Sequence, residues 1–175
     1  MSTVPRLETP RLILRPHHRE DLEAAVQIWS QEPVYRHITG SPLSRNDVWM
    51  RLLRYSGLWD FLGFGYWAVE FRLTGRYIGQ MGFADFKRGL DGFDSDHPEA
   101  GWLLDSRQAG RGLATEGMKA ALAWLDEQAS ISKSFCLIDE ANRPSIRVAE
   151  KLGYAFTLAT RLGDGSTGVY FRDKE

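Results

Sequence analysis

The sequence has little of what disulfide-linked or metal-binding proteins contain. Cys136 is its one cysteine among 175 residues, so no disulfide can form within the chain. The neighbours of Cys136 are apolar, which predicts a buried strand in which the thiol acts as a small hydrophobic side chain. The four histidines lack metal-site spacing, because His17 and His18 are adjacent and the other two stand alone. We therefore expect neither a disulfide framework nor a metal centre.

Long hydrophobic runs and an excess of one charge are also missing. No stretch approaches the roughly 20 apolar residues of a membrane-spanning helix, and residues 1–6 lack the apolar core of a signal peptide. The formal net charge is -1, with Lys and Arg spread along the chain, so no basic surface for nucleic acid is indicated. We expect one domain over residues 1–175, located in the cytoplasm, that binds neither nucleic acid nor membranes directly.

The hydrophobic pattern predicts an α/β (α+β) fold, a mixed but mostly antiparallel sheet with helices on both faces. Period-two and wholly apolar runs indicate seven strands, and apolar residues at helical spacing indicate four helices between them. The expected order is a strand at 12–14, helices at 22–29 and from Ser44, strands at 66–71, 77–86 and 100–104, a helix from Leu113, a strand at 135–138, a helix from Pro144 to Leu152, and a hairpin within 154–171.

The most informative segment is a turn between a strand and a helix, at residues 105–116. Free backbone N–H groups at a helix N-terminus bind anions, and Gly110 and Gly112 let the backbone approach a phosphate closely. Arg107 and Arg111 are expected to add positive charge there. For a bare Gly-x-Gly pattern, however, a turn that only links strand to helix is the commoner explanation.

Two other nucleotide-binding patterns do not fit this segment. A phosphate-binding loop of the Walker A type would need Gly-Lys-Ser/Thr, which is absent. A dinucleotide-binding loop would need a third glycine where Thr115 stands, and it would follow a parallel strand. The sequence therefore disfavours a nucleotide-dependent oxidoreductase.

Three segments together resemble the GNAT acetyltransferase superfamily. Residues 107–112 match its Arg/Gln-x-x-Gly-x-Gly/Ala pyrophosphate loop, and Ala-Thr-Glu follows at 114–116. Residues 142–154, Asn-x-x-Ser-x-x-Val-x-Glu-Lys-Leu-Gly-Tyr, resemble its second cofactor motif. Residues 9–15, Thr-Pro-Arg-Leu-x-Leu-Arg, are similar to the opening strand of the ribosomal-protein alanine acetyltransferase (RimJ/RimL-like) branch. The resemblance covers residues 9–154 in the order of the family.

The resemblance implies a splayed sheet with acetyl-CoA, the acetyl donor, wedged in its gap. Backbone amides of residues 108–114 would hold the pyrophosphate, and the strand ending at 102–104 would pair with the pantetheine arm. A backbone N–H of that strand would polarise the thioester carbonyl. The donor-binding residues so implied are Trp102, Leu103, Leu104, Arg107, Gln108, Ala109, Gly110, Arg111, Gly112, Leu113, Ala114, Asn142 and Ser145.

Acetyl transfer to an amine also needs groups that move protons, because a protonated amine has no lone pair. The resemblance implies Glu99 as the base; the alternative is that it caps a strand or pairs with a nearby basic residue. Many similar enzymes protonate the leaving thiolate with a tyrosine at the position of Ala149, so Ser145 is the replacement, or else it caps the helix. Asn142 is expected to bond either the pantetheine amide or the local backbone.

The sequence is compatible with two functions and with two classes of acceptor. We expect an N-acetyltransferase acting on a protein N-terminus or a small-molecule amine; the alternative is a non-catalytic acyl-CoA-binding or regulatory module. Dimers are common among similar enzymes. Five acidic residues form either a rim that attracts a cationic acceptor or a solvated loop. These are Asp85, Asp91, Asp94, Asp96 and Glu99.

Overall fold

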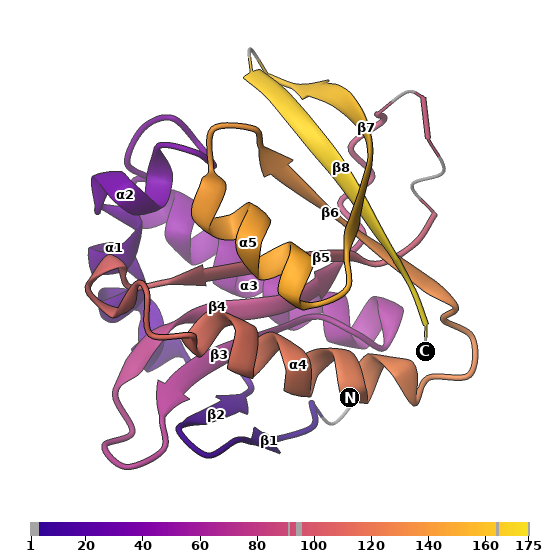
Figure 1. The fold of residues 1–175 in the computed structure, drawn as a ribbon. Helices are drawn as coiled ribbons and strands as arrows, with labels where there is room; N and C mark the ends of the chain where they lie inside the picture. Colours follow the sequence, from indigo (N-terminus) through magenta and orange to yellow (C-terminus); the bar gives the residue numbers. More distant parts are fainter. Residues whose placement is uncertain (1–3, 91, 94–95, 164, 175) are drawn as a thin grey trace.

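A computed structural model describes residues 4–90, 92–93, 96–163 and 165–174, and Figure 1 shows its fold. Eight strands form one sheet in the order β1-β2-β3-β4-β5-β6-β8-β7. The strands are β1 Leu7–Glu8, β2 Leu12–Arg15, β3 Tyr66–Phe71, β4 Tyr77–Ala84, β5 Glu99–Leu104, β6 Lys133–Asp139, β7 Ala155–Leu162 and β8 Gly165–Asp173. The α-helices are α1 Leu22–Trp29, α2 Glu32–Tyr35, α3 Arg45–Leu62, α4 Leu113–Asp126 and α5 Arg143–Lys151, and short 3₁₀ turns lie at Arg19–Asp21 (η1) and Ser106–Gln108 (η2).

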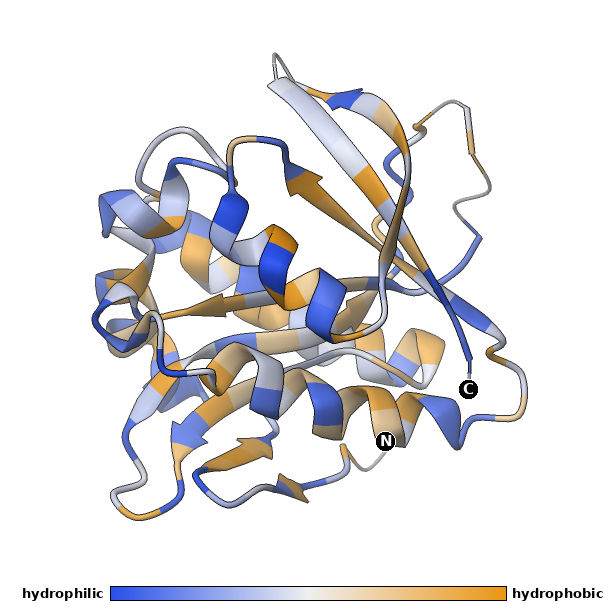
Figure 2. Ribbon diagram, viewed as in Figure 1, coloured by the Kyte–Doolittle hydropathy of each residue, from blue (hydrophilic) through white to orange (hydrophobic). Residues whose placement is uncertain are grey.

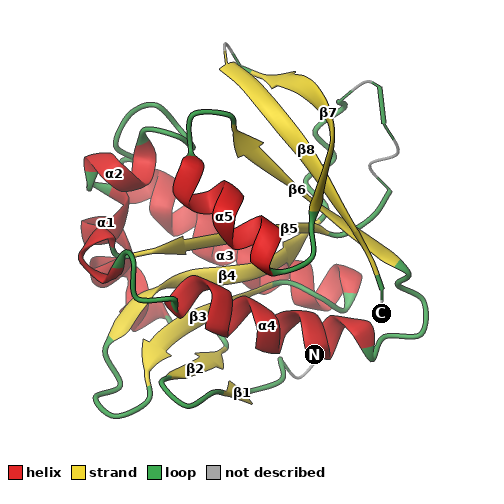
Figure 3. Cartoon of the chain, viewed as in Figure 1, coloured by secondary structure: helices red, strands yellow, loops and turns green. Residues whose placement is uncertain are grey.

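The sheet is antiparallel except between β5 and β6, so the mixed, mostly antiparallel sheet expected from the sequence is confirmed. Helices α4 and α5 lie on one face, and α1 and α3 on the other (Figures 1 and 3). The parallel pair is the one joined by a helical crossover, α4, as parallel strands require. The hairpin of β7 and β8 projects at the far edge of the sheet.

Two short elements differ from the sequence-based expectation. The sheet has eight strands rather than seven, because Leu7–Glu8 pairs with Leu14 and Ile13 of β2. A strand of two residues has no alternating pattern by which its sequence could reveal it. Pro33, which was expected to follow the first helix, lies in the first turn of a second short helix, α2. Proline is well placed there because the first helical N–H groups have no partner within the helix.

The hydrophobic core lies on both sides of the sheet. Figure 2 shows hydrophobic and hydrophilic residues alternating along α4 and α5, as expected of helices with one face on a sheet. On α4, Leu113, Met118 and Leu122 belong to the larger buried cluster. Cys136 joins the same cluster, and burial raises the pKa of its thiol. The prediction of a buried structural cysteine is confirmed.

A polar contact joins the N-terminal segment to α4. The Glu116 carboxylate accepts a hydrogen bond from the Thr9 hydroxyl (2.7 Å) and another from the Arg11 backbone N–H (2.9 Å). The Arg11 guanidinium pairs with the same carboxylate at 2.6 Å. Desolvation raises the pKa of Glu116, but these hydrogen bonds outweigh it and leave the pKa below its usual value. The opening-strand motif at residues 9–15 and the Ala-Thr-Glu segment at residues 114–116 are therefore in direct contact.

We expect Glu116→Ala to lower the free energy of unfolding by about 1–3 kcal/mol, because it removes the acceptor of the Arg11 N–H and the closer of the two acceptors of the Thr9 hydroxyl, the other being the Leu12 carbonyl. Urea unfolding at pH 7 measures this change. Lys119→Ala on the exposed side of α4 is the matched control. Equal stabilities of the two variants would contradict the contact. Since the folded-state pKa is depressed, the contribution of Glu116 is present at neutral pH and lost as pH falls through that pKa.

His17 gives the fold a second sensitivity to acid. Both ring nitrogens are buried without a hydrogen-bond partner in the described structure, and the ring stacks on Tyr55 at 5.5 Å. Burial lowers the pKa of His17 to about 4; the Asp21 carboxylate opposes this shift and the Arg15 guanidinium adds to it. The unfolded chain therefore binds a proton between pH 6.5 and about 4 that the folded chain does not.

Stability should accordingly fall as pH drops from about 6.5 to about 4. His17→Phe keeps the ring and removes the titration, so its free energy of unfolding should change less over this range than that of the wild type. Urea unfolding at pH 7, 6, 5 and 4.5 checks this, with His18→Gln at an exposed position as control. Identical pH dependence in wild type and His17→Phe would refute the assignment.

Candidate active site

Strands β5 and β6 pair at one position and then diverge. They pair in register only at Glu99 and Phe135, and the Phe135 N–H donates to the carbonyl of Pro98 at 3.1 Å. By contrast, β4 and β5 pair at six positions and β6 and β8 at seven. Beyond Glu99 the sheet opens into a cavity of about 860 Å³. The splayed sheet expected from the family resemblance is present.

The edge of β5 that faces the opening carries free backbone groups. The Asp105 N–H donates to Ile78 on β4, whereas the Pro98 carbonyl accepts from β6. Because hydrogen-bonding direction alternates along a strand, the N–H groups of Trp102 and Leu104 point toward the opening. The backbone of Leu103 points toward β4 instead, and its side chain lines the cavity. Of the predicted strand residues, Trp102 and Leu104 thus have backbone groups available to a ligand.

The turn between β5 and α4 exposes a run of unpaired N–H groups. Among the described residues, nothing accepts from the backbone N–H groups of residues 110–115. Gly110 (φ 75°) and Gly112 (φ 74°) adopt the left-handed conformation, which curves the chain around these donors. Residues 109–112 are exposed to solvent. The predicted anion site at the start of α4 therefore has free donors and an open approach.

Other predicted parts of this turn are used by the protein itself. The N–H groups of Gln108 and Ala109 donate to the carbonyls of Asp105 and Ser106, because the chain forms a 3₁₀ turn there. Arg107 pairs with the buried Asp105 carboxylate at 2.6 Å, which lowers the pKa of Asp105. The extra charge expected from Arg107 is thus neutralised, and the free donors begin at residue 110.

The side chain of Arg111 is held beside the same turn. Its guanidinium donates to the Gln108 side chain and lies over the Phe71 ring, 5.5 Å from the ring centre. The Arg11 guanidinium donates to the Arg111 carbonyl at 3.0 Å. No described carboxylate pairs with Arg111, so its charge remains available beside the anion site.

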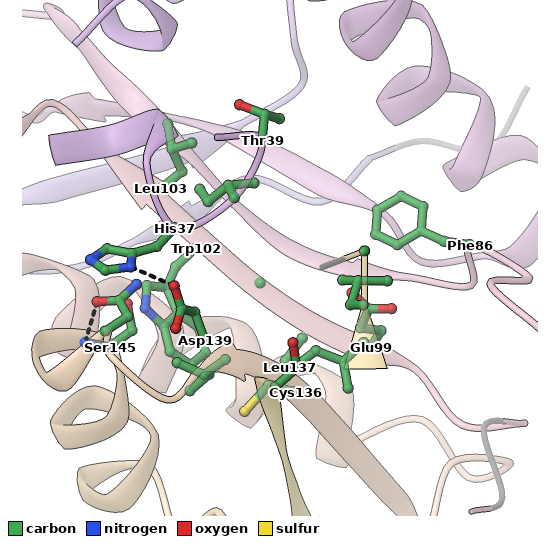
Figure 4. A pocket seen from close by; sticks show the side chains of 18 of the residues that line it. His37, Thr39, Phe86, Glu99, Trp102, Leu103, Cys136, Leu137, Asp139 and Ser145 are labelled. Carbon is green, nitrogen blue, oxygen red and sulfur yellow. Dashed lines mark hydrogen bonds and ion pairs between the residues drawn. The ribbon is translucent and has the colours of Figure 1, made fainter. Parts of the chain in front are cut away.

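Glu99 lies at the narrow end of the cavity, where β5 and β6 still pair, and Figure 4 shows it well apart from His37 and Ser145. Both of its carboxylate oxygens accept from Arg88, at 2.8 and 2.9 Å. Burial lowers the pKa of Arg88, but these hydrogen bonds outweigh it and raise that pKa overall. The alternative considered for Glu99, pairing with a nearby basic residue, is therefore present. The carboxylate also lines the cavity.

The second motif places its polar residues at the opposite end. Asn142 is the N-cap of α5, and its side-chain oxygen accepts from the Ser145 N–H at 3.3 Å. The interpretation of Ser145 as the cap is therefore wrong, because the residue three positions earlier takes that role. The described contact of Asn142 is thus with the local backbone. Ser145 is half-buried and lines the cavity, whereas Ala149 is fully buried in the core.

Sequence reasoning missed a histidine–aspartate pair beside Ser145. His37, in the segment after α2, lies 2.7 Å from Asp139 at the end of β6, measured between Nδ1 and Oδ2 (Figure 4). The His37 hydrogen bond lowers the pKa of Asp139. The two residues are 102 positions apart. No sequence spacing could reveal the pair, although a lone histidine before a predicted helix was a weak signal.

Tyr66 is a buried residue of β3, yet its hydroxyl reaches the cavity. A Cβ built on Gly101 would lie 1.9 Å from this oxygen, so the hydroxyl sits directly over β5. Burial, followed by the neighbouring Tyr55 and Glu99, raises the pKa of Tyr66 well above its usual value, so the phenol stays protonated. Gly101 is needed here because any side chain would displace the ring.

The expected acidic rim is largely paired where the structure describes it. Lys87 lies 2.7 Å from Asp85 and 3.8 Å from Asp96, and Arg88 holds Glu99. Asp91 and Asp94 lie outside the described residues. An attraction for cationic acceptors therefore does not follow from the described part of this loop.

The described residues contain neither a metal-binding cluster nor a membrane-spanning helix. No three His, Cys, Asp or Glu side chains among them are grouped so as to hold a metal ion. No helix in the described part of the chain combines the length and apolarity needed to cross a membrane.

Comparison with known proteins places this geometry in a family. The model of the acetyltransferase (GNAT) domain family matches residues 11–155. YkkB, an uncharacterised protein of Bacillus subtilis (strain 168), is 31% identical over 110 residues. That match covers 63% of this chain and 62% of YkkB, so the chain aligns with less than two thirds of this relative.

Solved structures agree over nearly the whole chain. A GNAT-family acetyltransferase from Bordetella pertussis is 30% identical with a TM-score of 0.84, covering 97% of this chain and 99% of that one. An acetyltransferase from Agrobacterium tumefaciens is 28% identical with a TM-score of 0.82, covering 97% and 95%. The fold alone is shared with two coenzyme A complexes, those of RimL (12%, TM-score 0.77) and of the aminoglycoside acetyltransferase AAC(6')-Ib (19%, TM-score 0.74). The opened sheet, the donor-rich turn and the match over residues 11–155 agree, and this chain belongs to the GNAT acetyltransferase family, which uses acetyl-CoA as its acetyl donor.

Proposed function

We propose that this protein transfers an acetyl group from acetyl-CoA to a primary amine by direct attack in a ternary complex. The observation that carries the proposal is the run of unpaired N–H groups at residues 110–115, next to the opening between β5 and β6. A diphosphate satisfies such a turn, since N–H groups and the positive end of a helix dipole both favour an anion. The rest of the donor then extends along β5 into the cavity.

In this arrangement the pantetheine arm takes the place of a missing strand. The N–H groups of Trp102 and Leu104 face the opening, and they are the donors available to its amide carbonyls and to the thioester carbonyl. A fixed N–H directed at an oxygen that gains negative charge lowers the barrier by a few kcal/mol in comparable sites. Asn142 and Ser145 line the other wall of the same opening. Their proposed role is to contact the donor from the α5 side.

We assign the role of base to Glu99, acting directly or through water. Its carboxylate lies at the narrow end of the cavity, and Tyr66 and Gly101 lie beside it. The bidentate contact with Arg88 holds the carboxylate in one orientation, but it also occupies both oxygens. An entering amine must therefore share the carboxylate with Arg88.

Ser145 is the proposed proton donor for the leaving thiolate. It projects into the cavity from α5, at the position where the family resemblance places a donor in the absence of tyrosine. Ala149, fully buried, cannot serve.

A second candidate function is a non-catalytic acyl-CoA-binding module. The lack of a tyrosine at position 149 and the pairing of Glu99 with Arg88 favour it. Thiol release that never exceeds background hydrolysis with any amine would support this second candidate.

The class of acceptor amine is a separate question. The opening motif at residues 9–15 supports a RimJ/RimL-like protein N-acetyltransferase. The fold is also shared with RimL, named as an α-N-protein acetyltransferase of ribosomal L7/L12, and with an aminoglycoside acetyltransferase. Since one fold serves acceptors of both kinds, the acceptor must be inferred from the cavity walls.

Gly110→Asp should abolish measurable acetyl-CoA binding, because it places a negative charge beside the diphosphate site. The added Cβ meets no atom within 4 Å, and the strain of a side chain at this positive φ is smallest for Asp and Asn, so it is matched between the two variants. Gly110→Asn has the same shape without the charge, so it should retain most of the affinity. Isothermal calorimetry compares the two, and unchanged affinity in Gly110→Asp would refute the placement of the diphosphate.

Glu99→Gln should reduce amine-dependent turnover about a hundredfold between pH 6 and 8, as loss of a general base typically does, while acetyl-CoA affinity is retained. Free-thiol release at saturating acetyl-CoA measures turnover. Arg88→Gln is the informative companion, since it releases the Glu99 carboxylate and should keep activity if Glu99 is the base. Full turnover in Glu99→Gln across this pH range would show that the base lies elsewhere.

A further inference from the structure

The cavity has a second wall that the proposed chemistry does not use. Its residues come from α1, from α3 and from the segment that follows β4, and we call it the α3 wall. It consists of Trp29, Arg51, Arg54, Tyr55 and Phe86. Because the donor enters from the side of the turn before α4, the α3 wall is left for the acceptor.

Two arginines of the α3 wall are positioned by aromatic rings rather than by carboxylates. Arg51 and Arg54 are three residues apart on α3, so they lie on one face of the helix. The Arg51 guanidinium stacks on Trp29, 4.6 Å from the ring centre, and that of Arg54 on Phe86 at 4.7 Å. Stacking fixes a guanidinium in place while leaving its N–H edge free for a planar anion.

The charges of these two arginines are not neutralised within the described structure. Neither forms an ion pair or hydrogen bond with a described residue, whereas the two carboxylates of the cavity each have one: Glu99 with Arg88, and Asp139 with His37. Asp47 lies one turn before Arg51; Ser44 donates two hydrogen bonds to its carboxylate, and the Arg51 charge acts on Asp47 without a direct contact. The α3 wall therefore carries two guanidinium groups without a direct carboxylate partner among the described residues, Arg51 half-buried and Arg54 exposed to solvent.

Phe86 links this wall to the proposed base. Arg54 and Arg88 stack on the same ring, at 4.7 and 4.6 Å, and Arg88 holds Glu99. Arg54 and Arg88 are thus neighbours about one ring, and the second of them contacts the carboxylate at which the amine is proposed to bind. An unpaired guanidinium in such a position binds a carboxylate through charge-assisted, frequently bidentate hydrogen bonds.

We propose that the α3 wall binds a carboxylate of the acceptor, so that the substrate is a primary amine that also carries a carboxylate several bonds away. This inference rests on the proposed acetyl transfer and specifies its acceptor. A free amino acid and a peptide with an acidic side chain near its N-terminus present the same chemistry, and the experiment below separates these two sources.

The test compares acceptors that differ only in the carboxylate. Glycine, β-alanine, 4-aminobutyrate and 6-aminohexanoate are assayed beside their carboxamides, together with short peptides that have Asp or Asn at the second position. The protein should acetylate the carboxylates with kcat/KM at least about tenfold above that of the matched carboxamides. The chain length that works best reports the distance from Glu99 to the arginines, and the peptide arm identifies the source of the carboxylate.

Variants of the α3 wall locate the effect. Arg54→Gln, Arg51→Gln and the double variant should raise KM for the best carboxylate acceptor about tenfold or more, leaving the carboxamide and the KM of acetyl-CoA unchanged. Arg45→Gln is the matched control, since it removes an equal charge from the same helix at a residue that pairs with Glu23 outside the cavity. Arg54→Lys should recover part of the loss, since the ammonium keeps the charge but not the planar fork.

Different outcomes separate this inference from the function on which it rests. Equal use of carboxylates and carboxamides, unaffected by the arginine variants, would overturn the carboxylate site and leave acetyl transfer standing. No thiol release with any amine would count against acetyl transfer itself. In that case calorimetry of 4-aminobutyrate and acidic peptides with the coenzyme A-loaded protein decides: binding lost in the double variant supports the site, and no binding overturns it.

Discussion

The structure depends on the separation of β5 and β6 after one paired position. A sheet that opens in its middle leaves two strand edges with unpaired N–H and C=O groups, which must find water or a ligand. In this protein the free groups of β5 are followed, after the internally bonded η2 turn, by the unpaired N–H groups that begin α4. One elongated molecule with a diphosphate at one end and amide groups along its length satisfies both. The opened sheet and the family's donor are two aspects of one hydrogen-bonding requirement.

The turn proposed to hold the diphosphate is anchored at both ends by side chains, which leaves its N–H groups at residues 110–115 free. Asp105, almost fully buried, accepts from the Arg107 N–H and side chain and from Gln31 near α2. At the other end, Glu116 is tied to the N-terminal segment, which is about 105 residues away in the chain. The backbone between these two anchors faces solvent, and its N–H groups at residues 110–115 have no acceptor among the described residues. Preorganised donors of this kind lose little entropy when they bind an anion.

Electrostatics divide the cavity into parts with different roles. At the narrow end a carboxylate and a guanidinium neutralise each other, and near α5 a histidine is hydrogen-bonded to a carboxylate. The net positive charge lies on α3, where two guanidinium groups rest on aromatic rings. A rim of acidic residues read from the sequence suggested the reverse sign, but the described members of that rim pair with Lys87 and Arg88. The sign of the net charge of a site depends on which charged side chains have no partner of opposite charge.

What the sequence alone determined was local. The cap formed by Ser44 and Asp47, the glycine turn at Gly110 and Gly112, and the apolar spacing of α4 each involve neighbours a few residues apart, so their geometry follows from the residues themselves. The fold class and the family could therefore be predicted from three motifs. The two-residue strand β1 could not, because its pairing comes entirely from β2. Likewise, only the tertiary structure brought Arg88 to Glu99 and His37 to Asp139, and placed Arg54 over Phe86. Ion pairs and ring stacking act at a few ångströms, so the partner of a charged side chain is decided by how distant elements pack.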